Sequence, residues 1–487
     1  MNFRKIALFL LVFNILFFSC NNNDDDVVSV ETPNDCGVTP TVQQINNFVY
    51  RGLRVFYLYK DQQPALANDR FNSAAETRNF TNSQCSTPEA FFEELTIPKD
   101  RFSFIVDDFE RLEQLFDGIN VSPGMKFFGT IYDDSNNALI AVTQILPGGP
   151  AEKAGIKRGM LFNRIDGIQL NRNNFSDQIS KTSYTLGKIE LENGVFTETD
   201  ETFDINEVEI KENPIAISKI MEVDGKKIGY LLYSGFIDGS EEELNAEFLK
   251  FKSQNITDLV LDLRYNGGGS VRTAIALGGM ITGQFNGQVF LKQKWNSDNQ
   301  AFLEESEPES LIEKFKAETP KGSKLNSLGL NKLYVITTKS RTASASELVP
   351  NSLSAHIDVV IIGDEEGTVG KSQASRTVYD SPSFAKGDSN RDKRHKYAMQ
   401  PLIYEVINKN DIGVPTDGLV PDIIAEEELG NFGVLGEANE PLLAKAIEAI
   451  TGSSVPVAKN LNTRKLGKII GSEDMNQPNF QRMYDNK

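Results

Sequence analysis

The segment from Leu333 to Gln373 constrains the fold more than any other part of this chain. It opens with an apolar, β-branched run, Leu333 to Thr338, which is typical of a strand buried in a sheet. A polar turn follows, and Ser344 with Glu347 three residues later marks the start of a helix. The segment therefore predicts a strand followed by a helix that begins at Ser344, where free backbone amides point outward.

Ser344 and Lys371 are the candidate nucleophile and base in this segment. A second apolar strand, residues 359–363, leads through a glycine-containing loop to Lys371. A free lysine has a pKa of ~10.4, so a lysine base must lie in an apolar pocket that disfavours its charged form. Ser344 and Glu347 also form a capping box, in which the serine only satisfies helix amides. The Gly-Lys-Ser sequence at Lys371 lacks the first glycine of a phosphate-binding loop.

Two motifs in the segment resemble the active-site pair of the tail-specific, or C-terminal processing, peptidases. These motifs are RTASASE, which contains Ser344, and GTVGKSQ, which contains Lys371. The resemblance implies that Ser344 is the nucleophile and Lys371 the general base of a Ser/Lys dyad. This family often has a glutamine four residues after the lysine, where this chain has Ser375. The nearest glutamine, Gln373, is the candidate for orienting Lys371, and the identity of that residue stays open.

A run of three glycines follows another predicted strand, residues 257–263. Glycines let the backbone turn sharply and direct N–H groups into a cleft, as in a phosphate site or a tight structural turn. The resemblance implies instead an oxyanion hole, for which the amides of Gly267, Gly268 and Ala345 are the candidates. Each such donor contributes roughly 3 kcal/mol to transition-state stabilisation.

Few histidines are available to act as a catalytic base, because the chain contains only 2, His356 and His395. A Ser/His/Asp triad would have to use one of them. The sequence also lacks the Gly-x-Ser-x-Gly nucleophile elbow of α/β-hydrolases. Both observations favour a lysine base.

The stretch from Ile145 to Gly167 resembles a PDZ domain, through a Gly-Pro-Ala helix start and a strand that ends in Ile-Asp-Gly. Such domains add a peptide to a sheet edge as a strand and hold its terminal carboxylate with loop amides. Phe127, Phe128 and Gly129 are the candidates for that loop. The alternative is a hydrophobic strand entry with no binding role.

The N-terminus predicts export. Arg4 and Lys5 precede an apolar run, Ile6 to Phe18, that is too short to span a membrane and ends at Cys20. A cysteine at this place resembles the lipobox of bacterial lipoproteins, which implies lipidation of Cys20 and a polar tether over residues 21–35. We therefore expect an outer-membrane lipoprotein of the bacterial envelope, facing the periplasm or the surface. A plain cleaved signal peptide is the alternative.

Charge and cysteine content limit the partners. The net charge is −18 and no long basic patch lies outside the tail, so nucleic acid is excluded as an expected partner. We expect Cys36 and Cys85 to form a disulfide in an oxidising envelope, and two inert buried thiols are the alternative. No Cys and His spacing resembles a zinc site, and the chemistry requires no metal or cofactor.

The expected fold is α/β with five parts after the signal peptide of residues 1–20. The resemblance implies a crotonase-like layered catalytic domain, residues 207–452, which includes the motif from Gly418 to Asp422. The remaining parts are the tether, a helical cap over residues 36–110, a PDZ domain over 122–206, and a tail, 453–487, without an assigned role. Within the cap, residues 41–59 have the 3.6-residue apolar period of a helix.

The expected function is a membrane-anchored serine endopeptidase. It would cleave proteins or peptides with accessible C-termini, near those ends, through Ser344, Lys371 and an acyl-enzyme. A catalytically inactive protein that binds partner tails in the PDZ groove is the alternative. An acyl-CoA enzyme on the same fold is supported only by the glycine turn.

Overall fold

A computed structural model describes residues 39–457 and 463–486 of the chain. The predicted signal peptide, Cys20, the tether and Cys36 lie outside the described residues. Cys85 is exposed, and its pairing with Cys36 stays a prediction. Within the described part, no helix combines the length and apolar character needed to cross a membrane.

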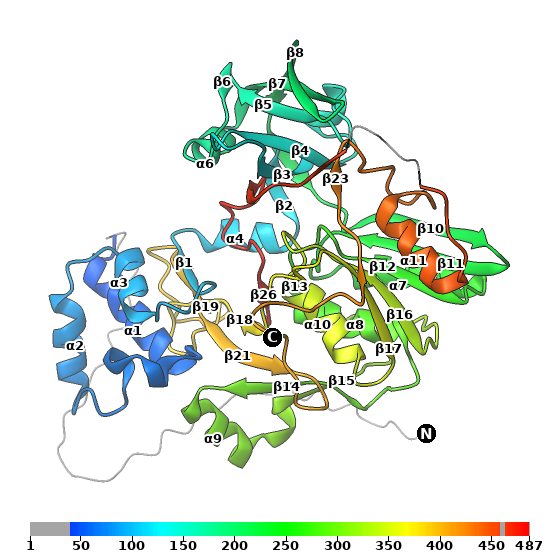
Figure 1. The fold of residues 1–487 in the computed structure, drawn as a ribbon. Helices are drawn as coiled ribbons and strands as arrows, with labels where there is room; N and C mark the ends of the chain where they lie inside the picture. Colours follow the sequence, from blue (N-terminus) through cyan, green and yellow to red (C-terminus); the bar gives the residue numbers. More distant parts are fainter. Residues whose placement is uncertain (1–38, 458–462, 487) are drawn as a thin grey trace, which may run out of the picture.

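A helical region forms the N-terminal end of the described chain (Figure 1). The helix predicted over residues 41–59 is confirmed as α1 (Val42–Phe56), which begins at a capping box of Thr41 and Gln44. The apolar face of α1 is buried with the side chains of α2 (Ala74–Ser83) and α3 (Pro88–Leu95). Two short 3₁₀ turns, Lys60–Gln62 and Pro64–Leu66, complete this region. The helix α4 (Phe109–Phe116) lies outside it and packs on Tyr484 through Leu112 and Phe116.

A six-stranded sheet forms the centre of the larger domain, in the order β10-β11-β12-β16-β17-β22. Its strands are β10 (Ile215–Val223), β11 (Lys226–Tyr233), β12 (Asp258–Asp262), β16 (Lys332–Ile336), β17 (Asp358–Gly363) and β22 (Ile423–Ile424). All neighbours pair in parallel except β10 and β11. Parallel strands covered on both faces are largely apolar, which is why the apolar runs of the sequence predicted β12, β16 and β17 correctly.

Helices cover both faces of this sheet. One face packs on α11 (Pro441–Thr451), and the other on α7 (Glu241–Ser253), α8 (Val271–Ile281) and α10 (Ala345–Leu353). Beyond those three helices lies a second sheet, in the order β13-β26-β18-β21-β14-β15. Its strands are β13 (Gly269–Ser270), β26 (Met483–Tyr484), β18 (Gln373–Ser375), β21 (Leu402–Ile407), β14 (Val289–Trp295) and β15 (Ile312–Lys314).

Smaller elements connect these layers. They are a sheet of β1 (Phe104–Val106), β20 (Ala398–Gln400) and β19 (Val378–Tyr379), the ribbon of β2 (Ile119–Ser122) and β9 (Val208–Lys211), the pair β23 (Glu428–Leu429) and β24 (Arg464–Lys465), α9 (Ser297–Ser306) and the 3₁₀ turn Pro308–Leu311. The helical region therefore joins the larger domain through the pairing of β1 with β20.

A separate sheet, which we call the β module (residues 125–206), lies above the larger domain in Figure 1. It contains β3 (Met125–Ile131), β4 (Ala138–Ile145), β5 (Leu161–Ile165), β6 (Ile168–Gln169), β7 (Ser183–Glu192), β8 (Val195–Asn206), α5 (Pro150–Lys153) and α6 (Phe175–Ile179). A strand from the C-terminal tail, β25 (Ile469–Ser472), pairs with β3 at its edge. The sequence assigned no role to this tail, and the structure places it in three sheets, through β24, β25 and β26.

Candidate active site

Ser344 lies where the chain passes from β16 to α10. It is fully buried, and its backbone has φ 64° and ψ −117°, a conformation that L-residues rarely adopt. Holding a non-glycine residue in such a conformation costs roughly 1–3 kcal/mol and is most frequent at functional sites. The surrounding layers therefore hold Ser344 in a strained geometry that a surface turn would relax.

The hydroxyl of Ser344 makes no capping bond. Its Oγ is buried and has no hydrogen-bond partner among the described residues. Glu347 instead caps the helix, because its carboxylate accepts the Ser344 N–H at 2.7 Å. The geometry thus leaves the serine hydroxyl free for chemistry and assigns the cap to the glutamate.

Glu347 also fixes the loop that carries Lys371. The same carboxylate accepts the N–H of Gly370 at 2.7 Å, the N–H of Lys371 at 2.9 Å and the hydroxyl of Thr368. Glu347 is itself fully buried. One carboxylate therefore ties the backbone of both candidate catalytic residues together, a role that the sequence signal Ser-x-x-Glu did not reveal.

Lys371 is fully buried, and its Nζ donates to the main-chain oxygen of Gln373. Nζ also lies 5.1 Å from the centre of the Phe102 ring. Burial lowers the pKa of Lys371 to about 7, and the positive charge of Arg482 adds to this effect, while Asp100 and Glu347 oppose it. The uncharged amine that a base requires is accordingly accessible near neutral pH.

Gln373 contacts Lys371 as predicted, but through its backbone and not through its side chain. The Gln373 side chain donates to the Ser372 hydroxyl at 3.0 Å, and only its backbone carbonyl reaches Nζ. A carbonyl contact is independent of the side chain, so sequence could not identify it. Phe102 and Arg482, the other neighbours of Lys371, come from distant segments and were also missed.

The glycine turn lies directly against Ser344. Gly268 has φ 109°, and a Cβ placed on it would lie 2.7 Å from the Ser344 Cβ. The Gly268 amide donates to the Asn266 side chain at 2.9 Å, so it is not free to hold an oxyanion in this state, contrary to our expectation. The amides of Gly267 and Ala345 donate to no other described residue. These two remain the available donors.

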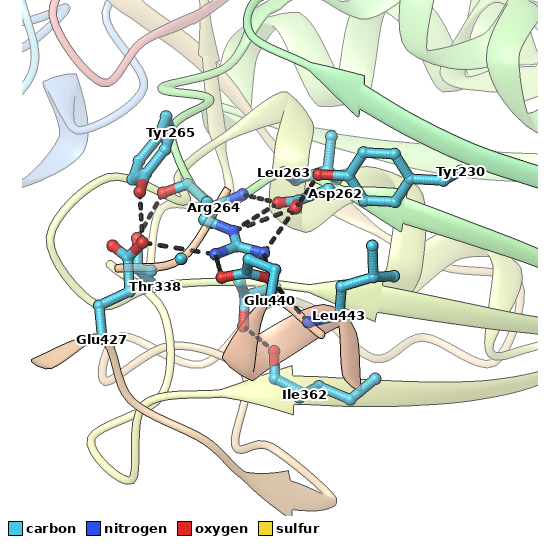
Figure 2. A network of polar contacts seen from close by, with 12 residues as sticks. Tyr230, Asp262, Leu263, Arg264, Tyr265, Thr338, Ile362, Glu427, Glu440 and Leu443 are labelled. Carbon is cyan, nitrogen blue, oxygen red and sulfur yellow. Dashed lines mark hydrogen bonds and ion pairs between the residues drawn. The ribbon is translucent and has the colours of Figure 1, made fainter. Parts of the chain in front are cut away.

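A buried network of charges fixes the strand end that precedes the glycine turn (Figure 2). Arg264 is fully buried and contacts Asp262 at 2.8 Å and Glu440 at 2.6 Å. The Thr338 hydroxyl, two residues after the end of β16, donates to the Arg264 carbonyl oxygen. Because a buried charge is costly unless it is paired, this set of partners locks the end of β12 against the segment that leads to Ser344.

The β module is anchored on the same network. Arg158 from the module donates to the Tyr265 hydroxyl at 2.6 Å and pairs with Glu427 at 2.8 Å. Tyr265 immediately follows Arg264 and immediately precedes the turn that starts at Asn266. The module is therefore held in contact with the loop that carries the glycines.

The prediction that Phe127, Phe128 and Gly129 form the carboxylate-binding loop was wrong. All three residues lie within β3, and both phenylalanine side chains are buried. The apolar run that suggested a strand entry is the strand itself. The loop before it contains Gly124, which has φ 76°.

A cavity of about 150 Å³ lies beside the glycine turn. Its lining contains residues 267–269, Met125 and Lys126 of the β module, and tail residues from Glu473 to Tyr484. Ser344 and Lys371 lie outside that lining. The tail therefore forms one wall of the space next to the candidate site.

Neither histidine contacts Ser344. His356 bonds to the carbonyl oxygen of Val289, and His395 bonds to Asp380 at 3.2 Å. Asp380, Asp392 and His395 form the one group of potential metal ligands found among the described residues. Arginine side chains pair with both carboxylates, and their positive charge disfavours a cation there.

The chain is similar to known peptidases over both its helical region and its larger domain. The family model for "Peptidase family S41" matches residues 227–423, and that for "Peptidase S41 N-terminal domain" matches residues 44–104. A carboxyl-terminal-processing protease from Picosynechococcus sp. is 23% identical over 310 residues, covering 63% of this chain and 65% of that protein. A carboxy-terminal-processing protease from Bartonella bacilliformis is 28% identical over 302 residues, covering 60% of each. The matches thus span less than two thirds of these relatives.

A solved structure has the same fold. The crystal structure of a candidate S41 protease from Bacteroides fragilis matches with a TM-score of 0.62 and 22% identity. The match covers 85% of this chain and 98% of that one. The mixed α/β architecture is therefore shared over most of both chains.

Proposed function

Because the chain belongs to peptidase family S41, we propose that it is a serine endopeptidase that cleaves proteins near their C-termini through Ser344 and Lys371. The observation that carries the proposal is a buried, strained serine with a free hydroxyl, tied through Glu347 to a buried lysine whose pKa is lowered to about 7. A purely structural serine cap would not need the lysine.

In the proposed reaction, uncharged Lys371 takes the proton of the Ser344 hydroxyl as Oγ attacks the substrate carbonyl carbon. The bond from Nζ to the Gln373 carbonyl uses one amine hydrogen and leaves the nitrogen lone pair for that proton. The Gly267 and Ala345 amides stabilise the oxyanion. The ammonium of Lys371 then protonates the leaving amine, and a water activated by the same lysine hydrolyses the acyl-enzyme. No hydrogen bond joins Ser344 Oγ to another described residue, and such contacts often tighten only when substrate binds.

The finer architecture belongs to the same proposal. The layered larger domain would be crotonase-like, and the β module would be a PDZ domain that receives a peptide strand along β3. The support is that β3 has an edge to which β25 adds as an antiparallel strand. We also propose that the protein is exported and anchored in the bacterial envelope through lipidated Cys20, on the basis of the N-terminal motif. Radiolabelled palmitate incorporation, lost in Cys20→Ala, tests that anchor.

The test of the activity uses an unfolded test protein incubated with the parent chain, Ser344→Ala and Lys371→Ala. Cleavage by the parent alone supports the dyad. Cleavage by both variants contradicts the mechanism. Absence of cleavage by all three favours a protein that binds partner tails in the β module.

A further inference from the structure

The C-terminal tail, which we define as residues 463–486, lies along the two parts of the molecule that a substrate would use. After β24 pairs with β23, the tail adds β25 to β3, with Ser472 opposite Phe128 and Gly471 opposite Gly129. β25 also packs on α6, since Gly471 lies against the Phe175 ring. The groove proposed to receive peptides is thus filled by the protein's own chain.

A carboxylate lies at the end of this strand, where a PDZ domain would hold a peptide terminus. Glu473 directly follows β25, and its carboxylate accepts the N–H of Phe127 at 2.9 Å. The same carboxylate pairs with Arg341 at 2.8 Å, and Arg341 is three residues before Ser344. The tail therefore imitates a bound peptide in the groove and contacts the nucleophile segment at once.

Beyond Glu473 the tail reaches the catalytic residues. The Gln481 side chain donates to the Ser340 carbonyl oxygen at 2.8 Å. A Cβ built on Gly268 would lie 2.7 Å from the Ser344 Cβ and 2.8 Å from the carbonyl oxygen of Arg482. The Arg482 carbonyl is consequently next to both the nucleophile and the glycine turn.

The residues after Arg482 are held as a strand between the two halves of the site. β26 pairs with β13, which follows the glycine turn, and with β18, which follows Lys371. The Met483 carbonyl accepts the Ser375 hydroxyl at 3.1 Å, and the Asp485 N–H donates to the Ser375 carbonyl at 2.9 Å. A peptide bound for cleavage would need this kind of backbone pairing on the leaving side of the bond.

We propose that the tail is a substrate of the chain's own active site, which cuts it in cis between Arg482 and Met483. The proposal rests on the proposed peptidase function and names a substrate for it. Ser344 Oγ forms a bond to the Arg482 carbonyl carbon and gives its proton to Lys371. The bond from that carbon to the Met483 nitrogen breaks, and the nitrogen takes the proton. Water then hydrolyses the ester, which leaves a carboxylate on Arg482 and restores Ser344.

Mass spectrometry of the whole, denatured chain tests this directly. Denaturation matters because Met483 and Tyr484 are buried in a sheet, so a released peptide can remain bound to the folded protein. The parent is expected to lose residues 483–487, at isolation or during incubation, and Ser344→Ala to stay full length. Ser344→Ala chains mixed with the parent are also expected to stay full length, because the cut is made in cis.

A pair of tail variants tests the role of the groove. Glu473→Ala removes the contacts with Phe127 and Arg341 and is expected to slow self-cleavage by at least about tenfold, because the tail loses its positioning. Lys468→Ala, which changes an exposed side chain of the same tail, is expected to match the parent. Equal rates for Glu473→Ala and the parent would overturn the proposal.

The remaining outcomes separate the two proposals. Cleavage at another bond, or shortening of Ser344→Ala chains by the parent, overturns the proposed cut in cis. A parent that digests the unfolded test protein but keeps its own tail also overturns it, and leaves the peptidase function standing with β26 as a structural strand. A parent that cuts neither contradicts both.

Discussion

Substituting Glu347 by glutamine should separate the positioning of the dyad from its chemistry. Glu347 Oε2 accepts the N–H groups of Ser344 and Lys371 at 2.7 and 2.9 Å. If the amide oxygen of the glutamine takes the position of Oε1, the NH₂ group of the glutamine takes the position of Oε2. That NH₂ group then faces the two N–H donors and cannot accept a hydrogen bond from either. Hydrogen bonds to charged groups contribute about 1.5–3 kcal/mol each, so roughly 3–6 kcal/mol is lost.

This loss should reduce kcat more than it changes KM. If half of the lower value, about 1.5 kcal/mol, is lost from transition-state stabilisation by the dyad, kcat falls by about tenfold. If about 3 kcal/mol is lost there, kcat falls by about a hundredfold. The assay measures initial rates on an unfolded test protein, with urea unfolding to confirm that the variant is folded. Glu366→Gln makes the same chemical change at an exposed carboxylate in the loop before Lys371, and it should match the parent. A folded Glu347→Gln with the kcat of the parent would refute the positioning role.

The same geometry gives four further predictions. Because Lys371 acts uncharged and its pKa is lowered to about 7, kcat/KM should fall about tenfold per pH unit below that value, and a rate independent of pH from roughly 5 to 9 would contradict the base. The folded pKa of Lys371 lies below its unfolded value of ~10.4, so this group should make the free energy of unfolding rise with pH between the two values, as measured by urea titration. In Gly268→Ala, the new Cβ would lie 2.7 Å from the Ser344 Cβ at a residue with φ 109°. Because this close contact displaces Ser344 or the turn, kcat should fall by at least about tenfold, and an unchanged kcat would show that the turn is free to move. Glu440→Gln removes a charged partner of buried Arg264 and should lower the free energy of unfolding by roughly 3–5 kcal/mol; an unchanged urea midpoint would contradict the importance of that network.

The sequence predicted the elements whose signals are local. The buried strands β12, β16 and β17 are largely apolar, and Ser344 is the N-cap residue of α10, at the place that the Ser-x-x-Glu pattern indicated. Ser344, Lys371 and the glycine turn were selected because each follows a predicted strand and because their motifs resemble those of the tail-specific peptidases. These features depend on neighbours within a few residues.

The features that sequence missed depend on contacts between distant segments. Phe102 and Arg482 reach Lys371 from opposite ends of the chain. Asn266 removes Gly268 from the oxyanion donors through a side-chain bond that no spacing rule predicts. The tail strands β25 and β26 are short and have no apolar period, so only their backbone pairing reveals them.

The measurement that tests the central claim most directly is labelling of the chain by a fluorophosphonate, which reacts with activated serines. The account predicts a single adduct on Ser344, located by peptide mass spectrometry, and a labelling rate that rises through a pH of about 7. Lys371→Met should slow labelling by at least about a hundredfold, because the base is removed while the apolar pocket stays filled. An adduct on another residue, or equal labelling of the parent and Lys371→Met, would contradict the account.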